Sequence, residues 1–116
     1  MNNRQLGNDY EISACEYLEK QGYRIVERNF RIHRGEIDII ALDGDVLVFV
    51  EVKYRRKNSF GYSAEAVTIQ KQRIIYKVAE GYLTLNAKYR NKPCRFDVIA
   101  IDNNELSHIK NAFGGL

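Results

Sequence analysis

The sequence predicts a single α/β domain, residues 1–116, in which a mixed central sheet is flanked by helices. The length of 116 residues suits one domain and is too short for two ordinary ones. Hydrophobic residues make up 45% and charged residues 28% of the chain, a balance typical of a packed globular protein. Segments with helical spacing of apolar residues alternate with short apolar runs, and this pattern predicts the order α-β-β-β-α-β-β.

The first two elements are an amphipathic helix and an outer strand. Apolar residues recur at helical spacing over Gly7–Gln21, and Gly22 stands where a helix commonly ends. The run from Tyr23 to Ile32 contains apolar residues interrupted by charges, which indicates a strand at the outside of the sheet. Arg34-Gly35 marks the turn that follows.

The next two strands are predicted to form a hairpin. Glu36–Leu42 and Asp45–Tyr54 are apolar runs joined by Asp43-Gly44. An Asp-Gly pair between such runs is one of the strongest local hairpin signals. The stretch from Arg55 to Tyr62 is basic, polar and contains glycine, so we expect a loop there.

The second half of the chain predicts a long helix and two strands. The helix begins at Glu65 or Thr68 and runs to Leu85, followed by a polar connection. Strands are expected at Arg95–Ile101 and Glu105–Lys110. A helix between the third and fourth strands permits a right-handed crossover, so these two strands are predicted to be parallel.

The expected register places the acidic residues of the hairpin on one face. If Asp43-Gly44 is a two-residue turn, Glu36 lies opposite Glu51, and Asp38 is a diagonal neighbour of Glu51. Because side chains alternate across a strand, Lys53 shares this face. The other face is expected to be wholly apolar, with Ile37, Ile39, Ala41, Val46, Val48, Val50 and Val52.

Asp38 and Glu51 are candidate metal ligands. Diagonal neighbours in a hairpin lie about 7–8 Å apart at the backbone, close enough for both carboxylates to reach one ion. Gathered carboxylates repel one another, and Lys53 or a divalent cation would offset this repulsion. Oxygen ligands without histidine or cysteine suit Mg²⁺ or Mn²⁺ better than zinc. The alternative is that Glu51 and Lys53 form a solvated pair on the strand.

Basic and polar residues flank this face. The loop after Lys53 begins with three basic residues, Arg55, Arg56 and Lys57. We expect this run to contact a nucleic-acid backbone, although such a run is also typical of a solvated loop. Gln70 and Lys71, near the start of the long helix, are candidates for contacting phosphate or orienting water, or for a solvated first turn.

Four further polar positions have interpretations of their own: Glu36, Asp97, His33 and His108. Glu36 is either an additional ligand or the polar start of its strand. Asp97 lies two residues after Arg95 on the same predicted face, which favours an internal ion pair over a ligand role. His33 and His108 are isolated in the sequence, so we expect surface or turn positions for both.

The chain resembles a known group of nucleases. Asp38, followed thirteen positions later by Glu51-Val52-Lys53, resembles the D…ExK core of the PD-(D/E)XK, or restriction-endonuclease-like, superfamily. More closely, the chain looks like a member of the YraN family, which is similar to archaeal Holliday-junction resolvases. Ile37 stands where the superfamily has its name-giving proline, which resolvase-like members often lack. The matching stretches are 7–22, 35–41, 48–55, 60–61, 65–67, Lys71, 94–100 and 111–113.

The resemblance implies an αβββαβ core and roles for four side chains. Asp38 and Glu51 would be the metal ligands and Lys53 the catalytic lysine. Glu11 would be the acid contributed by the first helix. The metal and lysine of such a site assist phosphodiester hydrolysis.

We therefore expect a Mg²⁺- or Mn²⁺-dependent endonuclease acting on DNA, with branched or structured DNA as candidate substrates. The alternatives are a nucleic-acid-binding module without turnover and a dimeric interaction protein. A homodimer is compatible with the endonuclease and with the interaction protein. No apolar run approaches the roughly 20 residues that span a bilayer, and the start carries no apolar signal segment. A cytoplasmic protein without membrane contact is expected.

Overall fold

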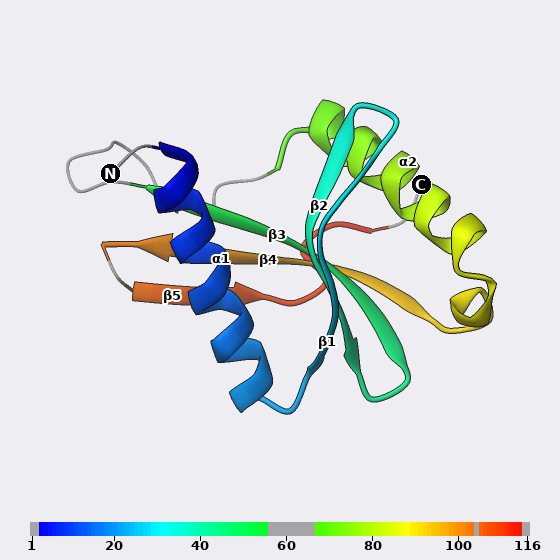
Figure 1. Cartoon of the computed structure of the whole chain (residues 1–116), viewed down its shortest axis with the longest axis horizontal. Helices are drawn as coiled ribbons and strands as arrows, with labels where there is room; N and C mark the ends of the chain where they lie inside the picture. The colour runs from blue at the N-terminus through cyan, green and yellow to red at the C-terminus, as the bar shows by residue number, and fades with distance from the viewer. Residues whose placement is uncertain (1–2, 56–66, 104, 115–116) are drawn as a thin grey trace.

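One five-stranded sheet forms the centre of the molecule (Figure 1). The computed structural model describes residues 3–55, 67–103 and 105–114. The strand order is β1-β2-β3-β4-β5, with β3 and β4 parallel and every other neighbouring pair antiparallel. The strands are β1 (Arg24–Ile32), β2 (Gly35–Asp43), β3 (Val46–Arg55), β4 (Cys94–Asp102) and β5 (Glu105–Ile109).

Two helices cover opposite faces of this sheet. α1 (Asn3–Lys20) packs on one face and α2 (Ile69–Leu85) on the other, and a short 3₁₀ helix, η1 (Ala87–Tyr89), follows α2. The class, the element order and the parallel β3–β4 pair confirm the sequence prediction. η1 lies in the segment for which the sequence predicts a polar connection, and it buries Tyr89 against the core under α2.

Each face carries its own hydrophobic core because residues of β3 alternate between the two sides. Leu47 and Phe49 belong to the core under α2, whereas Val48 and Val50 belong to the core under α1. Leu18 of α1 completes the second core and is fully buried. The apolar residues of the β2–β3 hairpin are therefore buried on both sides, which fixes the position of the two strands.

The register of the β2–β3 hairpin differs from the prediction by two residues. Asp43 pairs with Val46, so Gly44 and Asp45 form the turn, and Leu42 faces Leu47 rather than Asp45. Gly44 has a φ of 59°, which suits the first central position of a type II′ turn. A shift by two leaves each β3 residue on its predicted face, and continuing the register would bring Asp38 directly opposite Glu51.

The predicted apolar face is wrong at one residue, Ile37. Ile39 packs in the core under α1 as expected, but Ile37 packs in the core under α2. Residues two apart in a regular strand share a face, so β2 reverses its facing between them, at Asp38. This reversal removes Asp38 from the regular backbone pairing between β2 and β3.

Candidate functional site

Asp38 lies where the β2–β3 ladder ends. The last paired residues on this side of the hairpin are Ile39 and Val50. Beyond them, the Val52 amide donates a hydrogen bond of 2.8 Å to the Asp38 side-chain carboxylate. The side chain of Asp38 thus takes the place of a backbone partner between the two strands.

Four carboxylates gather around this point, and we refer to them as the acidic cluster: Glu11, Glu36, Asp38 and Glu51. One oxygen from each of Glu11, Glu36 and Asp38 lies within 4.8 Å of the others. Glu51 lies beside Asp38, whose pKa its negative charge raises, but its oxygens are not among the three that lie within 4.8 Å of one another. The structure therefore brings the predicted acids Glu11 and Asp38 together with Glu36, whose role the sequence left open, and places the predicted ligand Glu51 next to Asp38 but outside this group of three.

The surroundings of the acidic cluster disfavour the ionised form of two of its carboxyl groups, Asp38 and Glu11. Burial raises the pKa of Asp38 well above its ordinary value, and the hydrogen bond and charge of Glu51 raise it further. Burial also raises the pKa of Glu11, with a contribution from the Glu36 charge. Arg28 and Asn29 lower the pKa of Glu11, but the net shift is upward. A group of carboxylates in this state favours a positive ligand.

Three cationic side chains contact the rim of the cluster. Arg28 Nη2 lies 3.6 Å from Glu11 Oε1. Arg31 Nε lies 3.4 Å from Glu36 Oε2, and Lys71 Nζ lies 3.6 Å from Glu51 Oε2. Glu11 Oε1 is nevertheless buried without a hydrogen bond, so one oxygen of the cluster keeps its acceptor capacity unused.

Lys53 emerges on the same face of β3 as Glu51. The β3–β4 register is unbroken from Leu47 to Arg55, so residues 51 and 53 point the same way. Lys53 is partly buried, and within the described part of the chain its ammonium group forms no ion pair. The structure thus places Lys53 on the same face of β3 as Glu51, with no ion pair to a described residue.

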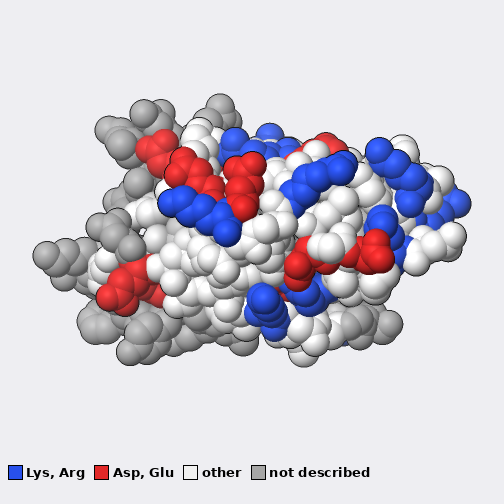
Figure 2. All heavy atoms as spheres, turned by 90° about the horizontal axis from the view of Figure 1, so that it is seen from below, with Lys and Arg blue, Asp and Glu red and all other residues white. Residues whose placement is uncertain are grey.

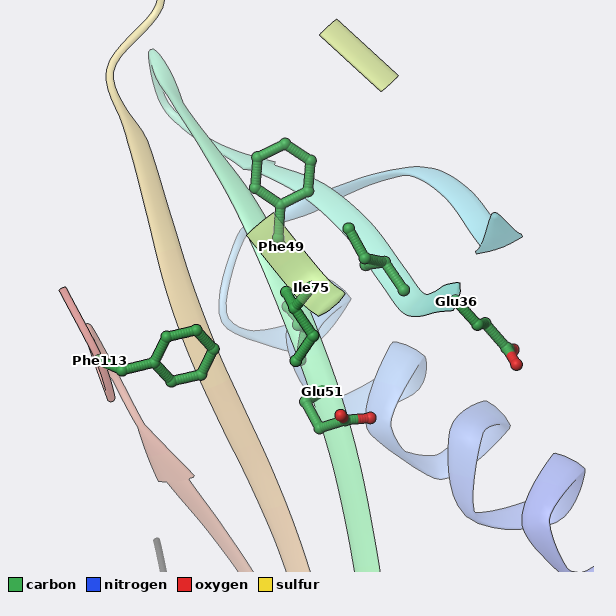
Figure 3. Close-up of a pocket in the computed structure, with 7 residues that line it drawn as sticks. Glu36, Phe49, Glu51, Ile75 and Phe113 are labelled. Carbon is green, nitrogen blue, oxygen red and sulfur yellow. The ribbon is translucent and has the colours of Figure 1, made fainter. Parts of the chain in front are cut away.

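A shallow hollow opens beside Glu51 on the α2 side of the sheet (Figure 3). Its lining is mainly apolar, with Glu36 and Glu51 at its acidic side, and both carboxylates point away from Phe113 (Figure 3). The residues that line it are Glu36, Ile37, Phe49, Val50, Glu51, Ile75 and Phe113.

The expected nucleic-acid contacts are placed only in part. Lys71 and Gln70 are exposed in the first turn of α2, which begins where Thr68 Oγ1 accepts a hydrogen bond from the Lys71 amide. Arg55 ends β3, whereas Arg56 and Lys57 lie outside the described residues. The face seen in Figure 2 carries basic and acidic side chains beside one another. The described part of this face, which is the lower side of the molecule in Figure 1, is therefore of mixed charge.

A second buried polar group, centred on Asp97, lies on the α1 side of β4 and β5. Arg95 Nε and Nη2 donate to its carboxylate at 2.8 and 3.0 Å, which confirms the predicted internal ion pair. His108 Nε2 lies 2.7 Å from the same carboxylate, and His108 Nδ1 lies 3.0 Å from the Tyr17 hydroxyl. The expectation of a surface position is wrong for His108, whose side chain is 5% exposed, and right for His33, exposed in the β1–β2 turn.

Sequence reasoning missed the contributions of β1 to the site. Arg28 lies 3.6 Å from Glu11, and the Asn29 side chain lowers the pKa of the same carboxyl group, although the sequence predicts no more than an outer strand here. The one available signal was the asparagine within the predicted strand, because asparagine tolerates backbone conformations that other side chains avoid.

Comparison with known proteins places the chain in a family. The sequence model of the family described as "Uncharacterised protein family UPF0102" matches residues 10–101. A UPF0102 protein of Caldicellulosiruptor saccharolyticus is 49% identical over 119 residues, covering 97% of this chain and 100% of the relative. A UPF0102 protein of Lachnoclostridium phytofermentans is 49% identical over 113 residues, covering 97% and 96%. One of Francisella tularensis subsp. tularensis is 47% identical over 111 residues, covering 95% of each.

Two expectations can be compared with these findings. In the described residues, no helix is long and apolar enough to cross a membrane. The matches confirm the family resemblance, since the YraN group carries the family designation UPF0102. The chain belongs to uncharacterised protein family UPF0102.

Proposed function

We propose that this protein is a Mg²⁺- or Mn²⁺-dependent endonuclease that hydrolyses phosphodiester bonds in DNA. The observation that carries this proposal is the acidic cluster at the end of the β2–β3 ladder, with Lys53 two residues after Glu51 on the same face of β3. The order of Asp38 and Glu51-Val52-Lys53 on neighbouring strands, together with Glu11 from α1, also matches the resemblance to PD-(D/E)XK nucleases.

The residues of the cluster fit a divalent cation. All of its donors are carboxylate oxygens, which Mg²⁺ and Mn²⁺ prefer. Burial and the neighbouring Glu51 raise the pKa of Asp38, and the buried Glu11 Oε1 has no hydrogen-bond donor among the described residues, so both groups would be stabilised by a cation. Asp38 and Glu51 would hold the ion, with Glu11 as a further acid at its side.

The chain supplies three functions for the reaction. Asp38, fixed by the Val52 amide, and Glu51 present oxygen donors in a constant position. Lys53 supplies a compact positive charge that would stabilise negative charge developing on the phosphoryl oxygens. Lys71, half exposed beside Glu51, would contact the DNA backbone. A divalent cation, when bound, lowers the pKa of an attacking water and neutralises a phosphate oxygen.

DNA with branches or other structure is the proposed substrate class, and a homodimer would suit a substrate with two-fold symmetry. The test incubates the purified protein with duplex, single-stranded and four-way DNA in Mg²⁺ or Mn²⁺. We expect metal-dependent cleavage that is lost in Asp38→Asn and Lys53→Ala. Asp45→Asn is the matched control, because Asp45 is an acid in the exposed β2–β3 turn with a side chain 93% exposed.

The outcomes separate this proposal from its rivals. Cleavage that persists in Asp38→Asn would assign the activity to another site or to a contaminant. Salt-sensitive DNA binding without cleavage and without metal uptake would favour a nucleic-acid-binding module. Oligomers with no affinity for DNA would favour an interaction protein.

A further inference from the structure

Asn29 has an unusual backbone conformation for a residue inside a strand. Its φ is 55°, in the left-handed region, within β1 (Arg24–Ile32). The other described residues with positive φ that are not glycine lie in turns or after the last strand: His33, Arg34, Asn103 and Asn111. The left-handed conformation of Asn29 is therefore not required by a turn.

The facing of β1 reverses at Asn29. Arg28 points toward α1, where its Nη2 atom donates to Asn8 Oδ1 at 3.0 Å and lies 3.6 Å from Glu11 Oε1. Phe30, two residues later, packs in the core under α2, with its ring 5.0 Å from that of Tyr82. Residues two apart in a regular strand share a face, so the left-handed residue between them produces the reversal.

The reversal in β1 coincides with the reversal in β2. Arg28 pairs with Ile39 and Phe30 pairs with Ile37, so Asn29 lies opposite Asp38. In β2, Ile37 faces α2 and Ile39 faces α1. Both strands thus change face at one cross-strand position, which keeps Phe30 and Ile37 on the same side of the sheet.

We infer that Asn29 is a positioning residue for the acidic cluster: its left-handed backbone lets β1 reverse together with β2, so that Asp38 leaves the ladder while Arg28 turns to Glu11. The inference rests on the proposed function in treating the cluster as a metal site. The Asn29 side chain also interacts with the Glu11 carboxyl group and lowers its pKa. Asparagine and glycine accept this conformation at little cost, whereas β-branched residues exclude it.

The first test compares Asn29→Gly with Asn29→Val by measuring Mn²⁺ affinity calorimetrically. Glycine keeps the left-handed backbone, so affinity should stay within about threefold of the wild type. Valine forces the strand out of this conformation, and we expect affinity to fall about tenfold or more. Asn29→Ala provides a milder variant if Asn29→Val does not fold.

Asn103 offers a matched control, because it has a φ of 50° in the β4–β5 turn. Asn103→Val should lower the melting temperature about as much as Asn29→Val, yet leave Mn²⁺ affinity unchanged. Equal loss of affinity in both valine variants would show that general destabilisation is responsible and would overturn the inference. Unchanged affinity in Asn29→Val and Asn29→Ala would overturn it as well.

A second test needs no metal and so separates this inference from the proposed function. In the wild type and in Asn29→Gly, Glu11→Gln changes the charge of a packed cluster and should shift the melting temperature by roughly 4 °C. In the Asn29→Val background, Glu11→Gln should shift the melting temperature by less than about 1 °C. The reason is that Glu11 would no longer contact Arg28 and the other carboxylates of the acidic cluster. An equal shift in all three backgrounds would overturn the positioning role, even if the wild type bound no Mn²⁺.

Discussion

Two aspartates of the same sheet, Asp38 and Asp97, experience opposite environments. Asp97 is fully buried and accepts hydrogen bonds from Arg95 and from the Asn111 amide, with His108 at 2.7 Å. Asp38 accepts one hydrogen bond from the Val52 amide and otherwise faces other carboxyl groups.

Their pKa values diverge accordingly. Burial by itself would raise the pKa of Asp97, but hydrogen bonds from His108, Arg95 and the Asn111 amide hold it at about 2. Burial and the neighbouring Glu51 raise the pKa of Asp38. A buried carboxylate stabilises the fold when hydrogen-bond donors and cationic side chains of the same chain surround it. A buried carboxylate without such donors is available to bind an external cation.

The largest expected effect is the loss of cleavage in Asp38→Asn. Removing this ligand should lower the cleavage rate by a factor on the order of 10³, since a preorganised charge is lost. The melting temperature should stay the same or rise, because repulsion within the acidic cluster decreases. Cleavage kinetics and thermal melts on one preparation check both parts. A large fall in melting temperature would indicate that Asp38 is structural like Asp97.

Asp97→Asn should lower the stability of the fold, in contrast to Asp38→Asn, which should lower the cleavage rate. Breaking a buried ion pair leaves Arg95 without its main partner, and we expect the free energy of unfolding to fall by about 3 kcal/mol. Asp43→Asn is the control, because Asp43 contacts Arg95 at 3.1 Å and its side chain is 37% exposed. Its cost should stay below about 1 kcal/mol in denaturant titrations. Equal costs for both variants would contradict the central role of Asp97.

The two aspartates should also have opposite effects on the pH dependence of stability. The pKa of Asp97 is lowered from 3.8 to about 2, so it contributes about 2 kcal/mol that is present above pH 4 and lost toward pH 2. The pKa of Asp38 is raised, so its contribution is present at low pH and is lost as the pH rises above the ordinary carboxyl range.

Urea titrations between pH 2 and pH 8 can separate these effects. Asp97→Asn should lose the steep change at acid pH, and Asp38→Asn should lose the decline toward neutral pH. A wild type whose stability rises steadily from pH 5 to pH 8 would be inconsistent with a raised pKa at Asp38.

Lys71→Gln should have the smallest effect. Loss of one phosphate contact is expected to weaken DNA binding a few-fold and to reduce the slope of log affinity against log salt by about 1. Lys20→Gln, at the exposed end of α1, serves as the control and should change neither quantity. Fluorescence anisotropy at several salt concentrations measures both. Identical behaviour of the two variants would remove Lys71 from the DNA interface.

The sequence predicted the fold well because its signals are local. Helical spacing, glycine at the end of α1 and the alternating β2–β3 hairpin each describe one element, and the long helix between β3 and β4 implied their parallel pairing. The turn was misplaced because Asp43-Gly44 fits two registers that differ by two residues. Only the pairing of Asp43 with Val46 decides between them.

The site was harder to predict because it depends on a break in regularity. Alternation placed Ile37 with Ile39, and no local signal shows that β2 reverses at Asp38. The proximity of Glu11 and Glu36 follows from the packing of α1 against the sheet, which is a tertiary property. His108 was misjudged for a similar reason, since its partner Asp97 lies on another strand.

Crystals soaked in Mn²⁺ and measured for anomalous scattering test the central claim most directly. The account predicts a strong peak within bonding distance of the Asp38 and Glu51 carboxylates, absent in crystals of Asp38→Asn. Well-diffracting crystals with no anomalous peak among these carboxylates at saturating Mn²⁺ would contradict it.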